Sequence, residues 1–291
     1  MYRANANLLI GSLVARLLPE YKSRLLKSWA DQSRFTRVDR LLFSPVMAAW
    51  AKFEYLAIPD PDERERAKDG LMGGQNAASW AEHYQRQPMD FTRPLGRMSY
   101  GEACPLMPGL DSLLEQRRDP TLVIQIGSSS GREIAWLAQR HPHHRYVGID
   151  PYPDVIEVSR RYHALPNLTF VAASARAIPG LIADRIEPVL LFSSGSLQYA
   201  QPEHVAKLFE ELAKRRRLEL WLLEPAQESG RDPSSVPGST WQGNFSYTHN
   251  YRCYAEAAGW QTKICEIIRP YSHDRMRRST VHYFYAGSTH E

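Results

Sequence analysis

Cysteine is scarce in this sequence. Its 291 residues include three cysteines, Cys104, Cys253 and Cys265, which form no CxxC pair and have no pair of histidines nearby. Structural zinc sites and disulfide frameworks need closely spaced or paired cysteines. The sequence therefore predicts reduced thiols, a cytoplasmic location and no bound metal.

Long apolar runs and a large excess of one charge are also missing. Residues 1–30 are rich in apolar side chains, but Arg16, Glu20 and Lys22 interrupt them and no small-residue cleavage site follows. This pattern predicts neither a membrane-spanning helix nor a signal peptide. The 36 Lys and Arg residues are nearly balanced by 32 Asp and Glu residues, for a formal net charge of +4. We expect a soluble protein that has no integral membrane span and binds no nucleic acid.

Residues 1–118 have helical periodicity and no strand alternation. Pro19 must kink or divide the first helix. We interpret residues 1–118 as a helical cap that faces a substrate; the alternatives are an accessory packing layer or the surface of a homodimer. We expect residues 8–29 to pack against the domain, with a partner subunit or a membrane surface as alternatives. Two apolar stripes predict buried helix faces, namely Ile10, Leu13, Val14, Leu17, Leu18 and Tyr21, and then Leu42, Val46, Trp50 and Phe53.

From residue 121 onward, short branched apolar runs alternate with helical stretches. Strands that are buried on both faces read as continuous Val, Ile and Leu runs, and helices between them imply parallel crossovers. The stretch 226–250 is polar at first and is predicted to be a variable insert. Residues 261–270 and 280–287 have no helix between them, which predicts an antiparallel pair at the sheet edge. We expect a doubly wound α/β sheet whose first strands occupy residues 121–127, 145–150, 168–173, 187–195 and 218–225.

Two features at the ends of the predicted strands indicate a ligand site. The turn 127–131 reads Gly-Ser-Ser-Ser-Gly, and glycine at both ends lets a ligand approach the backbone closely. The helix that starts near Arg132 points its N-terminal amides at the same place. Asp150 ends the second strand, where a carboxylate can accept both hydroxyls of a ribose. A dinucleotide-binding GxGxxG turn is disfavoured because Ser129 and Arg132 stand where it needs glycine.

Several motifs resemble those of the class I S-adenosylmethionine-dependent methyltransferases, from about residue 118 to the C-terminus. In chain order, the segments similar to their first five motifs are VIQIGSSSG at 123–131, VGID at 147–150, FVAASARAIP at 170–179, VLLFSSGSLQY at 189–199 and LWLLEP at 220–225. The resemblance implies a Rossmann-like, doubly wound, mostly parallel seven-stranded sheet with an antiparallel last strand. This domain would span residues 119–291 beside the N-terminal helical cap.

The resemblance also implies a cofactor, S-adenosyl-L-methionine, with S-adenosyl-L-homocysteine as its product. Three positions depart from the family pattern: Gln125 stands where an acidic residue is usual, Ser129 replaces a glycine, and Ser174 replaces an aspartate. The turn would wrap the methionine portion of the cofactor, and Asp150 would hold its ribose. The residues implied to bind the cofactor are Gly127, Ser128, Ser129, Gly131, Asp150, Tyr152, Ser174, Ala175, Ser193, Ser194 and Gly195.

Methyl transfer from a sulfonium asks mainly for alignment and exclusion of water. A general base helps where the acceptor is a hydroxyl or a protonated amine, and the candidates are Glu224, His249 and Tyr199. Glu224 either serves the acceptor or caps backbone amides. His249 is either a base or part of a helix N-cap. Tyr199 either orients the acceptor or packs in the core.

Aromatic and amide side chains are candidates for the acceptor pocket. We expect Tyr100, Gln198, Trp241 and Tyr247 to bind the substrate, aided by Trp80, Tyr84 and Phe245. The sequence thus predicts an EC 2.1.1-type enzyme that methylates an oxygen or nitrogen of a small molecule in metabolite or natural-product biosynthesis. The alternatives are an enzyme that uses the same cofactor for another reaction, a non-catalytic scaffold, and a nucleic-acid methyltransferase.

Overall fold

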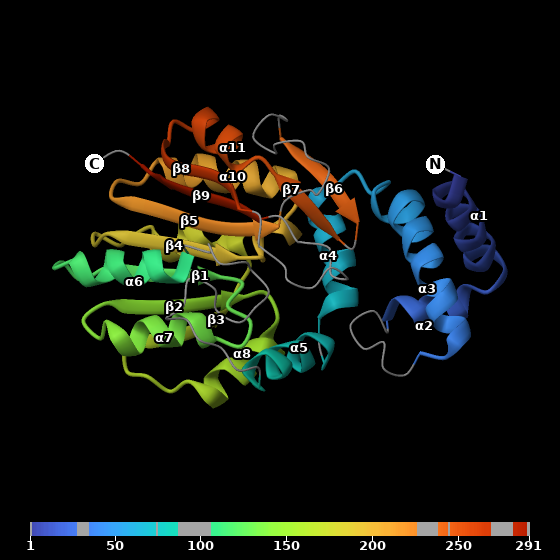
Figure 1. The fold of residues 1–291 in the computed structure, drawn as a ribbon, viewed down its shortest axis with the longest axis horizontal. Coiled ribbons are helices and arrows are strands. Elements are labelled where there is room, and N and C mark those ends of the chain that lie inside the picture. Colours follow the sequence, from blue (N-terminus) through green and yellow to red (C-terminus); the bar gives the residue numbers. More distant parts are fainter. Residues whose placement is uncertain are drawn as a thin grey trace.

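A computed structural model describes residues 2–27, 35–73, 75–86, 106–225, 238–243, 245–268 and 282–289. Its centre is a seven-stranded sheet with the order β3-β2-β1-β4-β5-β9-β8 (Figure 1). Only β9 runs antiparallel to its neighbours within this sheet. The strands are β1 (Leu122–Ile126), β2 (Arg145–Asp150), β3 (Leu168–Ala172), β4 (Val189–Ser194), β5 (Leu218–Pro225), β8 (Gln261–Ile268) and β9 (His282–Ser288). The expected doubly wound sheet and its antiparallel last strand are confirmed.

Helices cover both faces of this sheet, and each face has its own apolar core. Along β1, Leu122, Ile124 and Ile126 point to one core while Val123 points to the other. Because both faces are buried, the strand reads as a continuous apolar run. The first core includes α9 (Ile178–Ile182), α10 (Pro202–Ala213) and α11 (Tyr251–Ala257); the second includes α6 (Leu106–Gln116), α7 (Arg132–Arg140) and α8 (Pro153–Tyr162).

The N-terminal residues are helical, as expected. Their elements are α1 (Tyr2–Leu17), α2 (Pro19–Lys27), α3 (Arg37–Trp50), a π-helix (Ala51–Tyr55), α4 (Pro61–Met72) and α5 (Gln75–Arg86). Pro19 separates α1 from α2, which confirms the predicted break. Helices α1 to α3 lie to one side of the sheet, and α4 stands between them and the α/β domain (Figure 1). No helix in the described ranges is long and apolar enough to cross a membrane.

The buried face predicted for residues 10–21 is wrong at four of its six positions, whereas Val14 and Tyr21 pack against an apolar cluster of the N-terminal helices. Ile10, Leu13, Leu17 and Leu18 are each more than two-fifths exposed. Helix α1 instead packs on α3 through its small-residue side, where a Cβ atom at Gly11 would lie 2.0 Å from the carbonyl oxygen of Pro45. Close approach of the two backbones, rather than the leucine stripe, therefore sets the packing of α1.

The predicted insert contains a hairpin that the sequence pattern did not reveal. Strands β6 (Ser239–Gly243) and β7 (Ser246–His249) form a separate antiparallel sheet. Phe245 and Trp241 from this hairpin pack with Trp50 and Tyr55 of the cap, at ring-centroid distances of 5.1–5.5 Å. The hairpin thereby joins the cap to the α/β domain.

Candidate functional site

A cavity of about 400 Å³ opens at the carboxyl ends of the parallel strands. Its floor consists of the segments that follow β1, β2, β3 and β4, and residues of α4 and α5 form the opposite wall. A doubly wound sheet places its ligands at this edge. The volume is in the usual range for small-molecule sites.

The turn after β1 needs glycine at both ends. Gly127 has φ +67° and Gly131 has φ +76°. A Cβ atom at Gly127 would lie 2.2 Å from Ser196 Oγ, and one at Gly131 would lie 2.6 Å from Phe170 Cζ. Gly127, Ser128 and Ser129 line the cavity, whereas Gly131 sits behind the turn and lets it pack on β3. The Oγ atom of Ser128 is buried and has no hydrogen-bond partner among the described residues.

Asp150 lies on the cavity wall and is only 7% exposed. Its Oδ2 accepts the N–H of Ser129 at 3.2 Å, and its Oδ1 accepts the N–H of Tyr152 at 3.2 Å. Burial raises the pKa of the Asp150 carboxyl to about 6, although both backbone donors act in the opposite direction. The carboxylate is thus positioned by two loops and has acceptor capacity left for a ligand.

Further predicted cofactor residues surround the same space. Tyr152, Ser174, Ala175, Ser194 and Gly195 line the cavity. Ser193 does not, because it is fully buried behind the wall and its hydroxyl donates to Glu224 Oε1 at 2.6 Å.

Glu224 acts as a cap for the loop after β4. Its Oε1 accepts the N–H groups of Ser196 and Leu197 at 3.2 and 3.1 Å, and its Oε2 accepts the N–H of Gln198 at 3.2 Å. Burial raises the pKa of its carboxyl to about 7, against the effect of these donors. Glu224 is 1% exposed and is not on the cavity wall. Of the two roles considered from the sequence, the geometry favours capping.

The structure does not bring His249 to the cavity. The side chain is 1% exposed, Ser239 Oγ lies 2.6 Å from its Nδ1, and the carbonyl oxygen of Leu197 lies 3.2 Å from its Nε2. Burial lowers the pKa of the imidazole to about 4. One ring nitrogen therefore contacts β6 and the other contacts the loop after β4, so both are engaged. The helix N-cap next to it is Asn250, whose side chain accepts the N–H of Cys253.

The predicted acceptor residues divide into two groups. Tyr199 and Gln198 line the cavity, as do Trp80 and Tyr84 from α5, and burial raises the pKa of Tyr199 to about 12. Trp241 and Tyr247 do not line it; Trp241 packs in the cap core, and the hydroxyl of Tyr247 donates to Gln201 Oε1 at 3.2 Å. Trp241 and Tyr247 therefore hold the hairpin in place and do not contact a ligand in the cavity. Tyr100 lies outside the described residues.

A pair of polar side chains lies beside the turn; the sequence analysis named Gln125 only as a departure from the family pattern and missed its partner Glu133. Gln125 and Glu133 both line the cavity, and Gln125 Nε2 donates to Glu133 Oε2 at 2.5 Å. Burial raises the pKa of the Glu133 carboxyl to about 7. The sequence feature that could have identified Glu133 is its position in the first turn of the helix that follows the glycine-bounded turn, two residues after Gly131.

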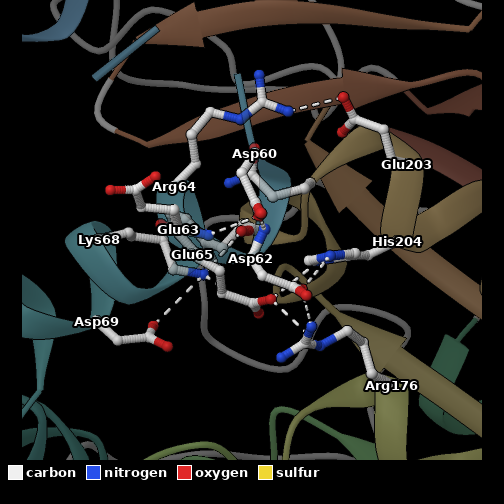
Figure 2. A network of polar contacts seen from close by, with 12 residues as sticks. Asp60, Asp62, Glu63, Arg64, Glu65, Lys68, Asp69, Arg176, Glu203 and His204 are labelled. Carbon is white, nitrogen blue, oxygen red and sulfur yellow. Dashed lines mark hydrogen bonds and ion pairs between the residues drawn. The ribbon is translucent and has the colours of Figure 1, made fainter. Parts of the chain in front are cut away.

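Helix α4 forms the charged side of the cavity. Asp60 caps its N-terminus by accepting the N–H groups of Asp62 and Glu63. Figure 2 shows Asp62 and Glu65 pointing toward His204 of α10 and Arg176 of the segment after β3. Each ring nitrogen of His204 lies 2.9 Å from one of these two carboxylates, and Arg176 pairs with both.

Further polar contacts fix the rest of α4. Lys68 Nζ donates to the carbonyl oxygen of Tyr199 at 2.9 Å, and the hydroxyl of Tyr152 donates to Asp69 Oδ1 at 3.1 Å. Asp62, Glu65 and His204 also bring three possible metal-ligand atoms, two carboxylate oxygens and one imidazole nitrogen, within 4.8 Å of one another. Because Arg176 already compensates both carboxylates, we interpret the group as a salt-bridge network, and the absence of a metal stays a prediction.

We expect high salt to weaken this network and so to make local opening of α4 more frequent. Replacing Arg176 with Ala should raise the hydrogen-exchange rates of the α4 amides by about two- to fivefold, since exposed ion pairs contribute about 0.2–1 kcal/mol each. Wild-type protein at high salt should show the same change. Arg145→Ala, which removes an ion pair with Glu187, is the matched control. Equal exchange in both variants would show that α4 is held by apolar packing instead.

The comparisons with known proteins agree with this fold. A family model described as a methyltransferase domain matches residues 123–217. The magnesium protoporphyrin IX methyltransferase from Synechocystis PCC 6803, solved with bound SAH, is similar over 77% of this chain and 99% of its own, with 12% identity and a TM-score of 0.50. A SAM-dependent methyltransferase from Anabaena variabilis is similar over 73% of this chain and 94% of its own, with 10% identity and a TM-score of 0.47.

The comparison with curated protein sequences found no match. The family model covers strands β1 to β4, with the glycine-bounded turn and Asp150, and ends just before β5. These are the elements that build the floor of the cavity. Residues 123–217 thus match a methyltransferase-domain family model, and the α/β domain has the Rossmann-like fold of the S-adenosylmethionine-dependent methyltransferases.

Proposed function

We propose that this protein transfers a methyl group from S-adenosyl-L-methionine to an oxygen or nitrogen atom of a small-molecule acceptor. The observation that carries the proposal is the cavity in which Asp150 and the turn 127–131 face α4 and α5. A macromolecular acceptor would need an open, charged docking face. A cavity walled by helices of the cap suits a small molecule better.

The residues on the cavity floor fit the cofactor. Gly127 lets the turn approach the loop after β4 closely, because a Cβ atom there would lie 2.2 Å from Ser196 Oγ, and Ser128 Oγ is a buried polar atom without a described partner. We propose that Ser128 and Ser129 hold the methionine portion, that Asp150 accepts the ribose hydroxyls, and that Tyr152 and Ala175 flank the adenine. When bound, S-adenosylmethionine supplies an activated methyl group on a sulfonium.

The chain itself would then align the acceptor and exclude water. Trp80 and Tyr84 of α5 and Tyr199 of the loop after β4 provide aromatic walls. Gln198 Nε2 donates to the carbonyl oxygen of Gly195 at 2.7 Å, which fixes the amide at the cavity wall. We propose that Gln198 and Tyr199 orient the acceptor. Its reacting atom would be held against the methyl group, a positional effect that alone can supply much of the rate enhancement.

Two further expectations are part of this proposal. We infer that α1 to α5 act as the substrate-facing cap expected for residues 1–118, since α4 and α5 supply one wall of the cavity, whereas α6 of that range packs in the second core of the α/β domain. We also infer a cytoplasmic enzyme of small-molecule biosynthesis, for which the absence of CxxC pairing is the argument. A homodimer through the cap stays a prediction that the mass of the protein in solution can test.

The test is product analysis with purified protein. Incubation with methyl-labelled S-adenosylmethionine and pools of small hydroxylated or amino compounds should give labelled acceptor and equimolar S-adenosylhomocysteine by mass spectrometry. Tyr199→Phe and Gln198→Ala should lower kcat/KM for the acceptor by about 10- to 100-fold without changing cofactor affinity. Methylthioadenosine as the nucleoside product would instead indicate transfer of another group of the cofactor.

A further inference from the structure

Gln125 and Glu133 form an anionic corner in the cavity. Gln125 is 2% exposed, and its amide Oε1 has no hydrogen-bond partner in the part of the chain that the structure describes. Its Nε2 donates to Glu133 Oε2 at 2.5 Å. The Gln125 amide therefore fixes Oε2 of Glu133, while Oε1 of Gln125 is left as an acceptor at the cavity wall. A buried acceptor without a donor is costly, so the corner is suited to a ligand that brings its own N–H donors.

The charge of the corner selects the kind of ligand. Arg132 is the neighbouring cation: its guanidinium donates to the carbonyl oxygen of Tyr84 at 2.6 Å, and its charge lowers the pKa of the Glu133 carboxyl by less than burial raises it. Tyr84 lines the same cavity, and burial together with the charge of the Glu133 carboxylate raises the pKa of its phenol. A neutral ligand would gain little beside a desolvated carboxylate. An ammonium group offers both the positive charge and three donors.

The position of the corner indicates which ammonium group it binds. Gln125 precedes the turn 127–131 by two residues on β1, and Glu133 follows it by two residues in α7. Both therefore flank the turn proposed to hold the methionine portion. Asp150, proposed to hold the ribose, lies at the end of the adjacent strand β2.

We propose that Glu133, held in place by Gln125, binds the α-ammonium group of the methionine portion of S-adenosylmethionine. This inference rests on the proposed function. In this arrangement the carboxylate of Glu133 comes from α7 and the neutral amide of Gln125 comes from β1. Helix α7 would thus bind the cofactor as well as pack on the sheet.

Calorimetric titration with two ligands tests the proposal. S-adenosylhomocysteine carries the ammonium group, whereas 5′-methylthioadenosine has the same nucleoside and lacks the amino-acid portion. Glu133→Gln should weaken S-adenosylhomocysteine by about 10- to 100-fold, the range for a charged hydrogen bond. It should leave the affinity for 5′-methylthioadenosine unchanged. Thermal unfolding of each variant checks that the fold is kept.

An exchanged pair provides the second variant. Gln125→Glu combined with Glu133→Gln retains one carboxylate and one amide in the corner, so it should recover most of the lost affinity for S-adenosylhomocysteine. In the wild type, this affinity should rise with pH between about 6 and 8, because the ionised carboxylate binds the ammonium group. Asp150 also changes its protonation state in this pH range, but this should change the affinities for both ligands alike, because both carry the ribose. The ratio of the two affinities therefore reports on Glu133 and should become independent of pH in Glu133→Gln.

Three results would overturn the proposal. If Glu133→Gln weakens both ligands equally, Glu133 only shapes the cavity. If it weakens neither ligand, the ammonium group binds elsewhere. If the wild type binds neither ligand, the proposed function fails together with this inference. The two failures can therefore be distinguished. If the wild type binds both ligands and Glu133→Gln changes both affinities equally, only the inference fails. If the wild type binds neither ligand, the proposed function fails too.

Discussion

Replacing Asp150 with Ala should raise the Kd for S-adenosylhomocysteine by about 100-fold or more. The two ribose hydroxyls of the ligand would each lose a charge-assisted hydrogen bond to the carboxylate, and each such bond contributes about 1.5–3 kcal/mol. The N–H groups of Ser129 and Tyr152 would also lose their acceptor, so the turn and the start of α8 would no longer be fixed. Calorimetric titration of the variant beside the wild type measures the effect.

Asp150→Asn is the matched control for charge. The amide oxygen can still accept one backbone N–H, so the loops should stay in place while the ribose loses a charged partner. We expect an intermediate loss of affinity. Because both S-adenosylhomocysteine and 5′-methylthioadenosine carry the ribose, both should be weakened, unlike in Glu133→Gln. Wild-type affinity in Asp150→Ala would show that the cavity does not hold the ribose at this carboxylate.

The raised pKa of Asp150 also predicts a cost in stability. The folded protein keeps this proton up to a pH of about 6, whereas an unfolded aspartate loses it near 3.8. Between these values the folded state binds more protons, so the contribution of Asp150 to stability falls as the pH rises. Above pH 6 the carboxylate is ionised, and its burial lowers the stability of the protein without ligand. Such a cost is typical of a ligand-binding group.

The sheet could be predicted from the sequence because its pattern is local. Leu122, Val123 and Ile124 are apolar in succession since β1 is buried on both faces, and no tertiary information is needed to see this. The face of α1 was not predictable in the same way. Its leucines repeat with helical spacing, but Gly11 allows a closer contact with Pro45 than any leucine does. Periodicity identifies the helix and does not identify its partner.

The same distinction applies to the candidate site. Gly127 and Asp150 are placed by the chain segments next to them, so their position on the cavity wall follows from strand order. The position of Trp241 depends on how the hairpin meets the cap, and that of His249 depends on how β7 meets the loop after β4; both contacts keep these side chains off the cavity wall. Glu133 was missed because it reads as an ordinary charge in the first turn of an amphipathic helix. Only the fold shows that this turn faces the cavity beside Gln125.

Replacing Glu224 with Ala should lower the free energy of unfolding by about 3–5 kcal/mol. Four donors would lose their acceptor, namely the hydroxyl of Ser193 and the N–H groups of Ser196, Leu197 and Gln198. A buried donor without a partner costs about 1–3 kcal/mol, and some relaxation of the loop recovers part of the sum. Urea unfolding, analysed with a common m-value, measures the change.

Two variants show whether capping is the reason. Glu219→Ala lies on the same strand and removes ion pairs with Arg117 and Lys263, so it should cost no more than about 1 kcal/mol. Glu224→Gln keeps one acceptor oxygen and should fall between the two. If Glu224→Ala is as stable as Glu219→Ala yet loses methyl transfer, Glu224 serves the acceptor after all. If stability and cofactor affinity fall together, the carboxylate acts through the loop after β4, because Ser194, Gly195 and Ser196 of that loop form part of the cavity wall.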